Sequence, residues 1–579
     1  MIGMILALRP YSKGAYKWLF VNLLAAVIGN GLILVNPLLI GFLVKDIVLG
    51  VTHNQVQLEN IIFMLILVAS FYVVGTILLW ISQSAAHKYA TLVTQNIRKD
   101  AFHIITHTPL SYLDRQSTGD ILTKFSQDMD LIFDALSHFF MQFFQGATTI
   151  IVSIGLMIYL NIWLTLIVIL TVPVILLYSS VTKKKGSRRF VEVQKLTGKL
   201  TALTHEFIAE KKLVMAYNYE KEAESRFDEV NKKLTTIAEK AYFVASINNP
   251  TYRMFNNIAY ALLGLTALIL HLVGHGVSID VMTSMIMYAA MFSRPFNEFS
   301  VLTANFFAGR AGLKRVNDLL EQETEIELAD VSEKSTVSTS NVSFKQVDFA
   351  YDKAVPLIKD FNLEVKTGQK IAIVGPTGSG KSTMINLLMR YYDIDKGSIS
   401  LDGRNIRSYT RNDLRLNFGL VLQEPWLFNG SIADNLKYGR KDATDHEMIE
   451  AAKKANCHDF ISKLKNGYDT ILGEDLNLSV GQKQLLTIAR ALIINPPILI
   501  LDEATSNIDS LMEKDIQETF AAVMKGKTSF VIAHRLKTIV DADIIIVMNK
   551  GRIVEYGSHT VLMHKQGFYA ELYQSQFQG

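Results

Sequence analysis

A glycine-rich segment, Gly375–Thr383, has the residue types and spacing of a loop that binds a polyphosphate. It reads Gly-Pro-Thr-Gly-Ser-Gly-Lys-Ser-Thr, follows the apolar run Lys370–Val374 and precedes a helix-like run. Glycines let successive backbone N–H groups face inward, and the start of a helix adds partial positive charge. Lys381 would reach the outer phosphates, and the hydroxyl of Ser382 is placed to ligate a bridging Mg²⁺. The predicted phosphate-binding residues are Gly375, Thr377, Gly378, Ser379, Gly380, Lys381, Ser382 and Thr383.

A second candidate site is the pair of carboxylates Asp502 and Glu503, which ends the apolar run Ile498–Leu501. This run is typical of a buried strand, and an acid at the carboxyl end of a parallel strand lies beside the phosphate loop. We expect Asp502 to hold Mg²⁺ through water and Glu503 to polarise the water that attacks the γ-phosphate. The two segments together predict a site that binds and hydrolyses a nucleoside triphosphate.

The N-terminal half of the chain has the composition of a membrane domain. Hydrophobic residues make up 49% of the 579 residues, and a chain of this length needs two or more domains. Six apolar runs are each near the ~20 residues that a spanning helix needs. They occupy residues 18–42, 60–82, 133–159, 161–180, 250–273 and 281–308. We therefore expect six spans.

Basic residues are distributed unevenly around these runs. The connection between the second and third runs contains Lys88, Arg98, Lys99, Arg115 and Lys124, and that between the fourth and fifth contains Lys183, Lys184, Lys185, Arg188 and Arg189. The alternate connections contain only Lys45. The positive-inside tendency therefore places both long connections and both termini in the cytoplasm. No cleaved signal peptide is expected.

Other features of the composition limit the function. The net charge of +4 gives no sign of nucleic-acid binding, and no nucleic-acid partner is expected. The single cysteine, Cys457, excludes an internal disulfide and a cysteine metal cluster, and we expect it to be a small buried side chain.

The expected architecture has two domains joined by a linker. Residues 1–320 would form the six-span domain, because both long connections are rich in helix formers and extend the spans into the cytosol. Their tips are predicted near His107–Tyr112 and Val214–Tyr219. Residues 321–341 form a polar linker. Residues 342–579 alternate strands with helices, so we expect a membrane α-helical domain fused to an α/β P-loop nucleotide-binding domain.

Some residues in the predicted spans disturb helices or are polar, among them Asn248, Asn249, Pro250, Asn256, Asn257, Pro295 and Asn297. They mark either a bend or water-filled cavity, or else hydrogen bonds between helices with no substrate contact. The sequence leaves both interpretations open.

The segment Leu478–Gln482 reads Leu-Ser-Val-Gly-Gln and precedes a helical run. Here the chain resembles the ATP-binding cassette (ABC) proteins, whose signature has this pattern, and its N-terminal half resembles their six-span exporter domain. The resemblance implies ATP and Mg²⁺ as cofactors, Tyr351 stacked on adenine, Gln423 at the magnesium ion, and His534 orienting Glu503 as a second catalytic residue. It also implies that Ser479, Gly481 and Gln482 contribute to the ATP site of an opposite subunit, and that Asp509, at the end of the D-loop, is a further nucleotide-binding residue.

Two departures from the family pattern concern the partner. Val480 replaces the usual glycine of the signature, and Asn507-Ile508 replaces the more usual Ala-Leu. Similar deviations occur in subunits of heterodimeric exporters with one weakened ATP site. The chain is therefore expected to pair with a second ABC half-transporter, and the departures favour a heterodimer over a homodimer.

The resemblance implies an ATPase that exports small amphipathic substrates, such as drugs, lipids or peptides, by alternating access. The expected location is the bacterial inner membrane, with the nucleotide-binding domain in the cytoplasm. An ATP-gated channel or regulator, and an importer built on the exporter fold, are the alternatives. The intact Glu503 and His534 disfavour a channel.

Overall fold

The computed structural model describes residues 6–54, 56–273, 277–325, 340–473, 478–502, 510–532 and 539–577. The chain divides into two compact units. One contains Met1–Thr106 and Ser117–Gln322, and the other contains His107–Gln116 and Glu323–Gly579. The short segment His107–Gln116 thus belongs to the C-terminal unit, although the chain on both sides of it belongs to the N-terminal unit.

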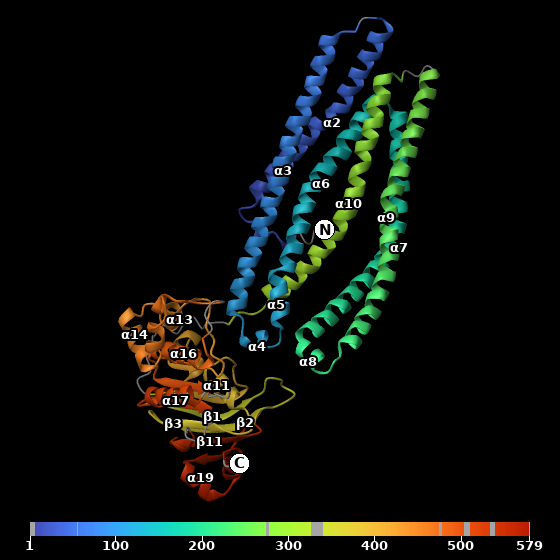
Figure 1. Ribbon diagram of the computed structural model, residues 1–579. Helices are drawn as coiled ribbons and strands as arrows, with labels where there is room; N and C mark the ends of the chain where they lie inside the picture. Colours follow the sequence, from blue (N-terminus) through green and yellow to red (C-terminus); the bar gives the residue numbers. More distant parts are fainter. Residues whose placement is uncertain are drawn as a thin grey trace. The chain divides into compact units, whose positions relative to one another are not determined.

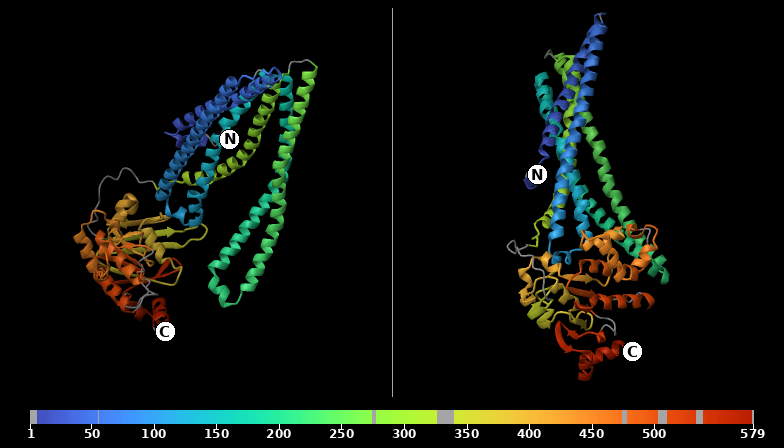
Figure 2. Two further views of the ribbon diagram at one scale, coloured as in Figure 1. Left: turned by 45° about the horizontal axis from the view of Figure 1, so that its top comes forward. Right: turned by 90° about the vertical axis from the view of Figure 1, so that its left-hand side faces the viewer.

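Long helices dominate the N-terminal unit (Figure 1). They are α2 (Tyr16–Thr52), α3 (Leu58–His107), α6 (Gln127–Leu160), α7 (Ile162–Ala209), α9 (Glu220–Leu272) and α10 (Ile279–Leu320). Shorter helices of this unit are η1 (Pro10–Ser12), α5 (Thr118–Phe125) and α8 (Lys211–Ala216), whereas α4 (Leu110–Leu113) lies in the segment that belongs to the C-terminal unit. Each predicted apolar run falls mainly within one long helix. Figures 1 and 2 show α7 and α9 side by side along their length, joined at the tip that holds α8.

Four of these segments are long and apolar enough to cross a membrane by length and composition: Tyr16–Thr52, Leu58–His107, Thr118–Leu160 and Arg253–Leu272. In α7, which begins at Ile162, the apolar segment within the residues searched is Ile162–Thr171. In α10, Arg294 and Glu298 interrupt the apolar sequence about one turn apart, and they form an ion pair with each other at 2.9 Å. The sixth predicted span is therefore helical but is interrupted by charged residues.

Small and polar side chains hold the N-terminal helices together. At Gly29 a Cβ atom would lie 2.8 Å from the Cβ of Leu78, so glycine allows α2 and α3 to approach closely. Asn30 of α2 donates to Thr149 Oγ1 of α6 at 2.7 Å, and Tyr288 of α10 donates to the carbonyl of Leu34 at 2.7 Å. Hydrogen bonds between helices are thus present at Asn30 and Tyr288, whereas the side chains of Asn248, Asn249 and Asn297 lie outside the described part of the chain.

The C-terminal unit is built on two sheets. The smaller has the order β2-β1-β4-β5 and is antiparallel. The larger has the order β12-β11-β3-β10-β9-β6, and its strands are parallel except for β12. The strands are β1 (Val342–Phe349), β2 (Ile358–Val365), β3 (Lys370–Val374), β4 (Lys396–Leu401), β5 (Arg404–Asn405), β6 (Phe418–Val421), β9 (Ile498–Asp502), β10 (Thr528–Ile532), β11 (Ile544–Asn549) and β12 (Arg552–Gly557). A separate pair joins β7 (Gly430–Ser431) and β8 (Ile471–Leu472).

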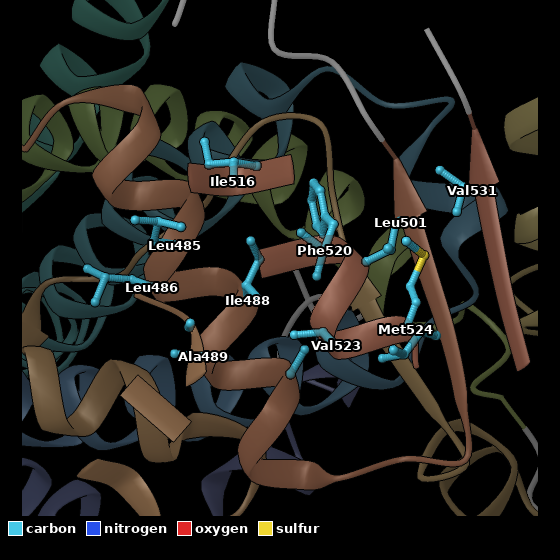
Figure 3. Close-up of a cluster of buried hydrophobic side chains, with 14 of the residues drawn as sticks. Leu485, Leu486, Ile488, Ala489, Leu501, Ile516, Phe520, Val523, Met524 and Val531 are labelled. Atoms are coloured by element: carbon cyan, nitrogen blue, oxygen red, sulfur yellow. The ribbon is translucent and has the colours of Figure 1, made fainter. Parts of the chain in front are cut away.

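Helices of the C-terminal unit pack on the larger sheet or on one another. They are α11 (Lys381–Leu388), α12 (Arg411–Arg415), α13 (Ile432–Leu436), α14 (Asp445–Lys454), α15 (His458–Ser462), α16 (Val480–Ile494), α17 (Ser510–Met524), α19 (His559–Lys565) and α20 (Phe568–Phe577), with short turns η2 (Ile406–Ser408), η3 (Lys437–Gly439) and η4 (Gly467–Asp469). Alternate residues of β3 enter different cores: Ala372 joins the cluster under α16 and α17, and Ile373 joins the cluster under α11. Figure 3 shows side chains of α16 and α17 meeting Leu501 and Val531 of the sheet.

Candidate nucleotide-binding site

The glycine-rich segment forms the turn between β3 and α11, as expected. Gly380 precedes the first residue of α11 with φ 101°, a left-handed conformation that favours glycine. At Gly375 a Cβ atom would lie 2.2 Å from the carbonyl oxygen of Met548, so only glycine allows this close approach to β11. Thr377, Gly378 and Ser382 are exposed, whereas Ser379 and Thr383 are buried. The loop therefore offers backbone N–H groups and hydroxyls at the start of a helix.

Lys381 lies inside this loop. Its ammonium group donates to the carbonyls of Gly375 at 2.8 Å and Pro376 at 3.1 Å. Burial lowers the pKa of Lys381 below its ordinary value, and the nearby carboxylate of Asp502 opposes that shift. A phosphate bound in the loop would add negative charge beside the ammonium group and favour its charged form. In the part of the chain that the structure describes, the buried hydroxyl oxygen of Ser379 has no hydrogen-bond partner.

The acid and the amide predicted at the metal lie at the same edge of the sheet as the loop. Asp502 is the last residue of β9, and β10 separates β9 from β3. Ile532 of β10 is opposite Ile373 on one side and Asp502 on the other, so the backbone of Asp502 lies ~10 Å from that of Ile373. Gln423 is exposed and follows the end of β6 by two residues. The three parallel strands thus bring the loop, Asp502 and Gln423 to one edge.

The signature segment begins α16. Ser479 and Gln482 form a capping box: the Ser479 hydroxyl accepts from Gln482 N at 3.2 Å, and Gln482 Oε1 accepts from Ser479 N at 3.0 Å. Gly481 is buried, and Val480 is 46% exposed. Because the cap uses only the acceptor role of the Ser479 oxygen, its O–H remains able to donate to an anion.

Comparison with known proteins agrees with this geometry. Residues 19–296 match the family model for the ABC transporter transmembrane region, and residues 358–506 match the model for ABC transporter. An uncharacterised ABC transporter ATP-binding protein, YfiC of Bacillus subtilis, is 35% identical over 94% of this chain and 89% of its own. A fatty acid ABC transporter ATP-binding/permease protein of Mycobacterium bovis is 34% identical over 88% and 80%. The chain belongs to the ABC transporters.

Two further comparisons specify the type. An ATP-dependent lipid A-core flippase of Aliivibrio fischeri is 35% identical over 84% of each chain. The structure of a bacterial Atm1-family ABC exporter with ATP bound superposes with a TM-score of 0.77 and 27% identity, and the match covers 98% of both chains. The predicted family and fold class are confirmed: this is an ABC half-transporter of the exporter type, an ATP-binding membrane protein whose ATPase activity drives transport.

The aromatic residue of the transporter's predicted adenine site is held by its neighbours. Tyr351 is 41% exposed. Its hydroxyl donates to Thr383 Oγ1 at 3.3 Å and accepts from Asn386 Nδ2 at 3.1 Å. Its ring also makes an edge contact with Tyr392, at 4.9 Å between centroids. Thr383 thus faces Tyr351, and a base stacked on Tyr351 would lie close to α11.

Three predicted residues of the transporter lie outside the described residues: Glu503, His534 and Asp509. Glu503 directly follows Asp502, and His534 follows the last residue of β10 by two positions. Their catalytic and nucleotide-binding roles stay predictions.

Sequence reasoning missed a link between α16 and the segment after Gln423. Arg490 of α16 donates to the carbonyl of Trp426 at 3.1 Å and to Asn435 Oδ1 at 3.0 Å. Asn435 in turn donates to the carbonyl of Phe428 at 3.0 Å. Burial lowers the pKa of Arg490 from its ordinary value, but a guanidinium remains charged at neutral pH. Neither residue has a sequence signal that predicts this contact.

Proposed function

We propose that the transporter exports an amphipathic, lipid-like substrate by ATP-driven alternating access. The observation that carries this proposal is the phosphate loop with Lys381 beside Asp502, on a chain whose other unit contains long apolar helices. Relatives named as a fatty acid transporter and as lipid A-core flippases support a lipid-like substrate. In this proposal the apolar spans surround the acyl part of the substrate.

The predicted metal residues suit Mg²⁺. Ser382, Gln423 and Asp502 would supply a hydroxyl, an amide and a carboxylate oxygen, and magnesium prefers such hard oxygen donors together with phosphate oxygens and water. Among the described residues there is no cluster of three or more His, Cys, Asp or Glu side chains that could hold a metal by itself. The ion would therefore arrive with ATP, and it would neutralise charge on the outer phosphates.

The remaining roles follow the family pattern. Tyr351 would stack on adenine, the N–H groups of Gly375–Gly380 would cradle the phosphates, and Lys381 would exchange its carbonyl partners for phosphate oxygens. Glu503 would polarise the attacking water and His534 would orient Glu503. Removal of the Glu503 carboxylate should then stop hydrolysis without preventing ATP binding.

We propose that two half-transporters form the working unit, with Ser479, Gly481, Gln482 and Asp509 of one chain closing the ATP site of the other. The preference for a heterodimer, which rests on Val480 and Asn507-Ile508, receives no support from the relatives. We also propose the inner membrane as the location, with both termini and residues 342–579 in the cytoplasm and residues 321–341 as the linker.

The test uses the chain purified alone and reconstituted in liposomes that contain a fluorescent phospholipid or fatty acid. Wild-type protein should hydrolyse ATP, move the labelled lipid across the bilayer in an ATP-dependent way and have the mass of a dimer. Glu503→Gln should bind ATP but lose both activities. ATP turnover without movement of any labelled lipid would refute the lipid-like substrate. Turnover unchanged by Glu503→Gln would refute the catalytic assignment.

A further inference from the structure

The C-terminal end of the phosphate-loop helix carries a charged side chain that does not belong to the helix. Arg415 of α12 donates to the carbonyls of Met389 and Arg390 at 3.3 Å each, just beyond the last residue of α11. Its guanidinium also stacks on the ring of Tyr391 at 5.0 Å. A cation at the C-terminal end of a helix satisfies free carbonyls and interacts favourably with the helix dipole. Arg415 therefore links α12 to the C-terminal end of α11.

Glu325 is the acidic partner of this arginine. Its carboxylate lies 3.8 Å from Arg415 and 3.5 Å from Arg411, and its side chain is only 18% exposed. Arg411 is held on its other side by Asp393 at 3.3 Å. Since Glu325 and Arg411 are largely shielded from water, their ion pair is stronger than one on an open surface.

The backbone of Glu325 ties the same network to two long helices. Its N–H donates to the carbonyl of His107 at 2.7 Å, and His107 is the last residue of α3. Glu325 itself follows Leu320, the last residue of α10, by five positions. One residue thus joins the far end of the phosphate-loop helix to the chain ends of α3 and α10.

A second contact reinforces this connection. Tyr392, two residues beyond Arg390, donates its hydroxyl to Asp114, which follows α4. Tyr392 also contacts Tyr351, whose hydroxyl bonds to α11 through Thr383. Two contacts, one through Glu325 and one through Asp114, therefore connect the region just after α11 to segments that continue into the long helices.

We propose that Glu325 is a positioning residue that transmits movement of the phosphate-loop helix to α3 and α10 when ATP binds. This inference rests on the proposed function, because it needs nucleotide-driven motion of the long helices. Energetic coupling between two sites can pass through a continuous series of packed and hydrogen-bonded groups. The residues from Lys381 along α11 to Arg415 and Glu325 form such a series between the phosphate loop and the long helices.

The experiment measures an ATP-dependent distance in the full-length protein in lipid nanodiscs. A spin label is placed at the exposed α3 residue Lys99 through Lys99→Cys, and the distance between labels is recorded with and without ATP. Glu325→Gln removes the charge while keeping the shape. Glu323→Gln is the matched control, because Glu323 is an exposed carboxylate two residues away that forms no ion pair within the described residues.

Wild type and Glu323→Gln should show the same ATP-dependent change. In Glu325→Gln the shifted fraction should fall roughly fivefold or more while ATP affinity stays within about twofold of wild type. Arg411→Gln should cause a similar loss, and the double variant should be no worse than either single one, because both remove the same interaction.

Three results would overturn the inference. An unchanged distance response in Glu325→Gln would show that the residue does not transmit motion. An equal loss of ATP affinity would show that it only supports the nucleotide site. A wild-type protein whose labels do not respond to ATP would refute the proposed function, and the inference with it.

Discussion

Gly551, in the turn between β11 and β12, should be required for ATP binding although it lies far from the phosphate loop in sequence. Its N–H donates to the carbonyl of Ser379 in that loop at 3.0 Å. Its φ is +75°, and an added Cβ atom would lie 1.4 Å from the carbonyl oxygen of Leu357. Gly551→Ala must therefore displace the turn, and the bond to Ser379 moves with it.

Gly526 provides a matched control for this substitution. It has φ +78°, and an added Cβ atom would meet nothing within 4 Å. Both alanine variants pay ~1 kcal/mol for the left-handed backbone. Gly551→Ala additionally loses a hydrogen bond, worth ~1 kcal/mol, and suffers overpacking of ~1–3 kcal/mol. If about half of this extra cost falls on the phosphate loop, ATP affinity should drop about tenfold.

The assay is a titration of the full-length protein with a fluorescent ATP analogue, combined with thermal unfolding. Gly526→Ala should lower the unfolding temperature slightly and leave ATP affinity unchanged. Gly551→Ala should lower both. Equal ATP affinity in the two variants, at whatever stability, would refute the argument that this turn supports the loop.

Three other results are expected. Arg315→Ala should lower the free energy of unfolding by ~2 kcal/mol in thermal unfolding, because it leaves the 1% exposed carboxylate of Asp128 without its partner. Arg310→Ala, at an exposed position of the same helix, is the control and should change stability little. Equal effects of the two substitutions would contradict the role of the ion pair. Tyr351→Phe should keep most ATP affinity and Tyr351→Ala should lose about tenfold in the same titration, whereas equal affinities would exclude stacking. Burial raises the pKa of the Cys457 thiol to about 12, so the thiol should resist maleimide at pH 8 in native protein and react in unfolded protein. The contribution of the neutral thiol to the free energy of unfolding is fully present below pH ~9 and declines above it, because the thiol of the unfolded chain ionises first.

The phosphate loop could be predicted from the sequence because its determinants are local. Gly375, Gly380 and Lys381 act through the backbone within a few residues, and the strand and helix on either side are marked by their own apolar patterns. The capping box of Ser479 and Gln482 is likewise a signal over four residues. For such elements, residue type and spacing already contain most of the geometry.

The contacts made by Glu325, Arg490 and Gly551 could not be predicted in the same way. Glu325 lies in a polar stretch that looks like ordinary linker, and its partners Arg411 and Arg415 are about 90 residues away along the printed sequence. The contact between Glu325 and these two arginines depends on the order of the strands and on where α12 begins. No local sequence pattern predicts either of these. By contrast, the helix-forming composition of the long connections predicted that the apolar runs continue as helices, and α7 does so as far as Ala209.

The assignment of His107–Gln116 to the C-terminal unit has a consequence for dividing the protein into fragments. The chain passes between the two units three times, near residues 106, 116 and 322, so a single cut cannot separate them. A fragment that starts at β1 would lack both Asp114 and Glu325, so Tyr392 and Arg415 would lose these acidic partners and Arg411 would keep only Asp393. Enzymatic properties measured on such a fragment would describe a nucleotide-binding unit with an incomplete surface at the end of α11.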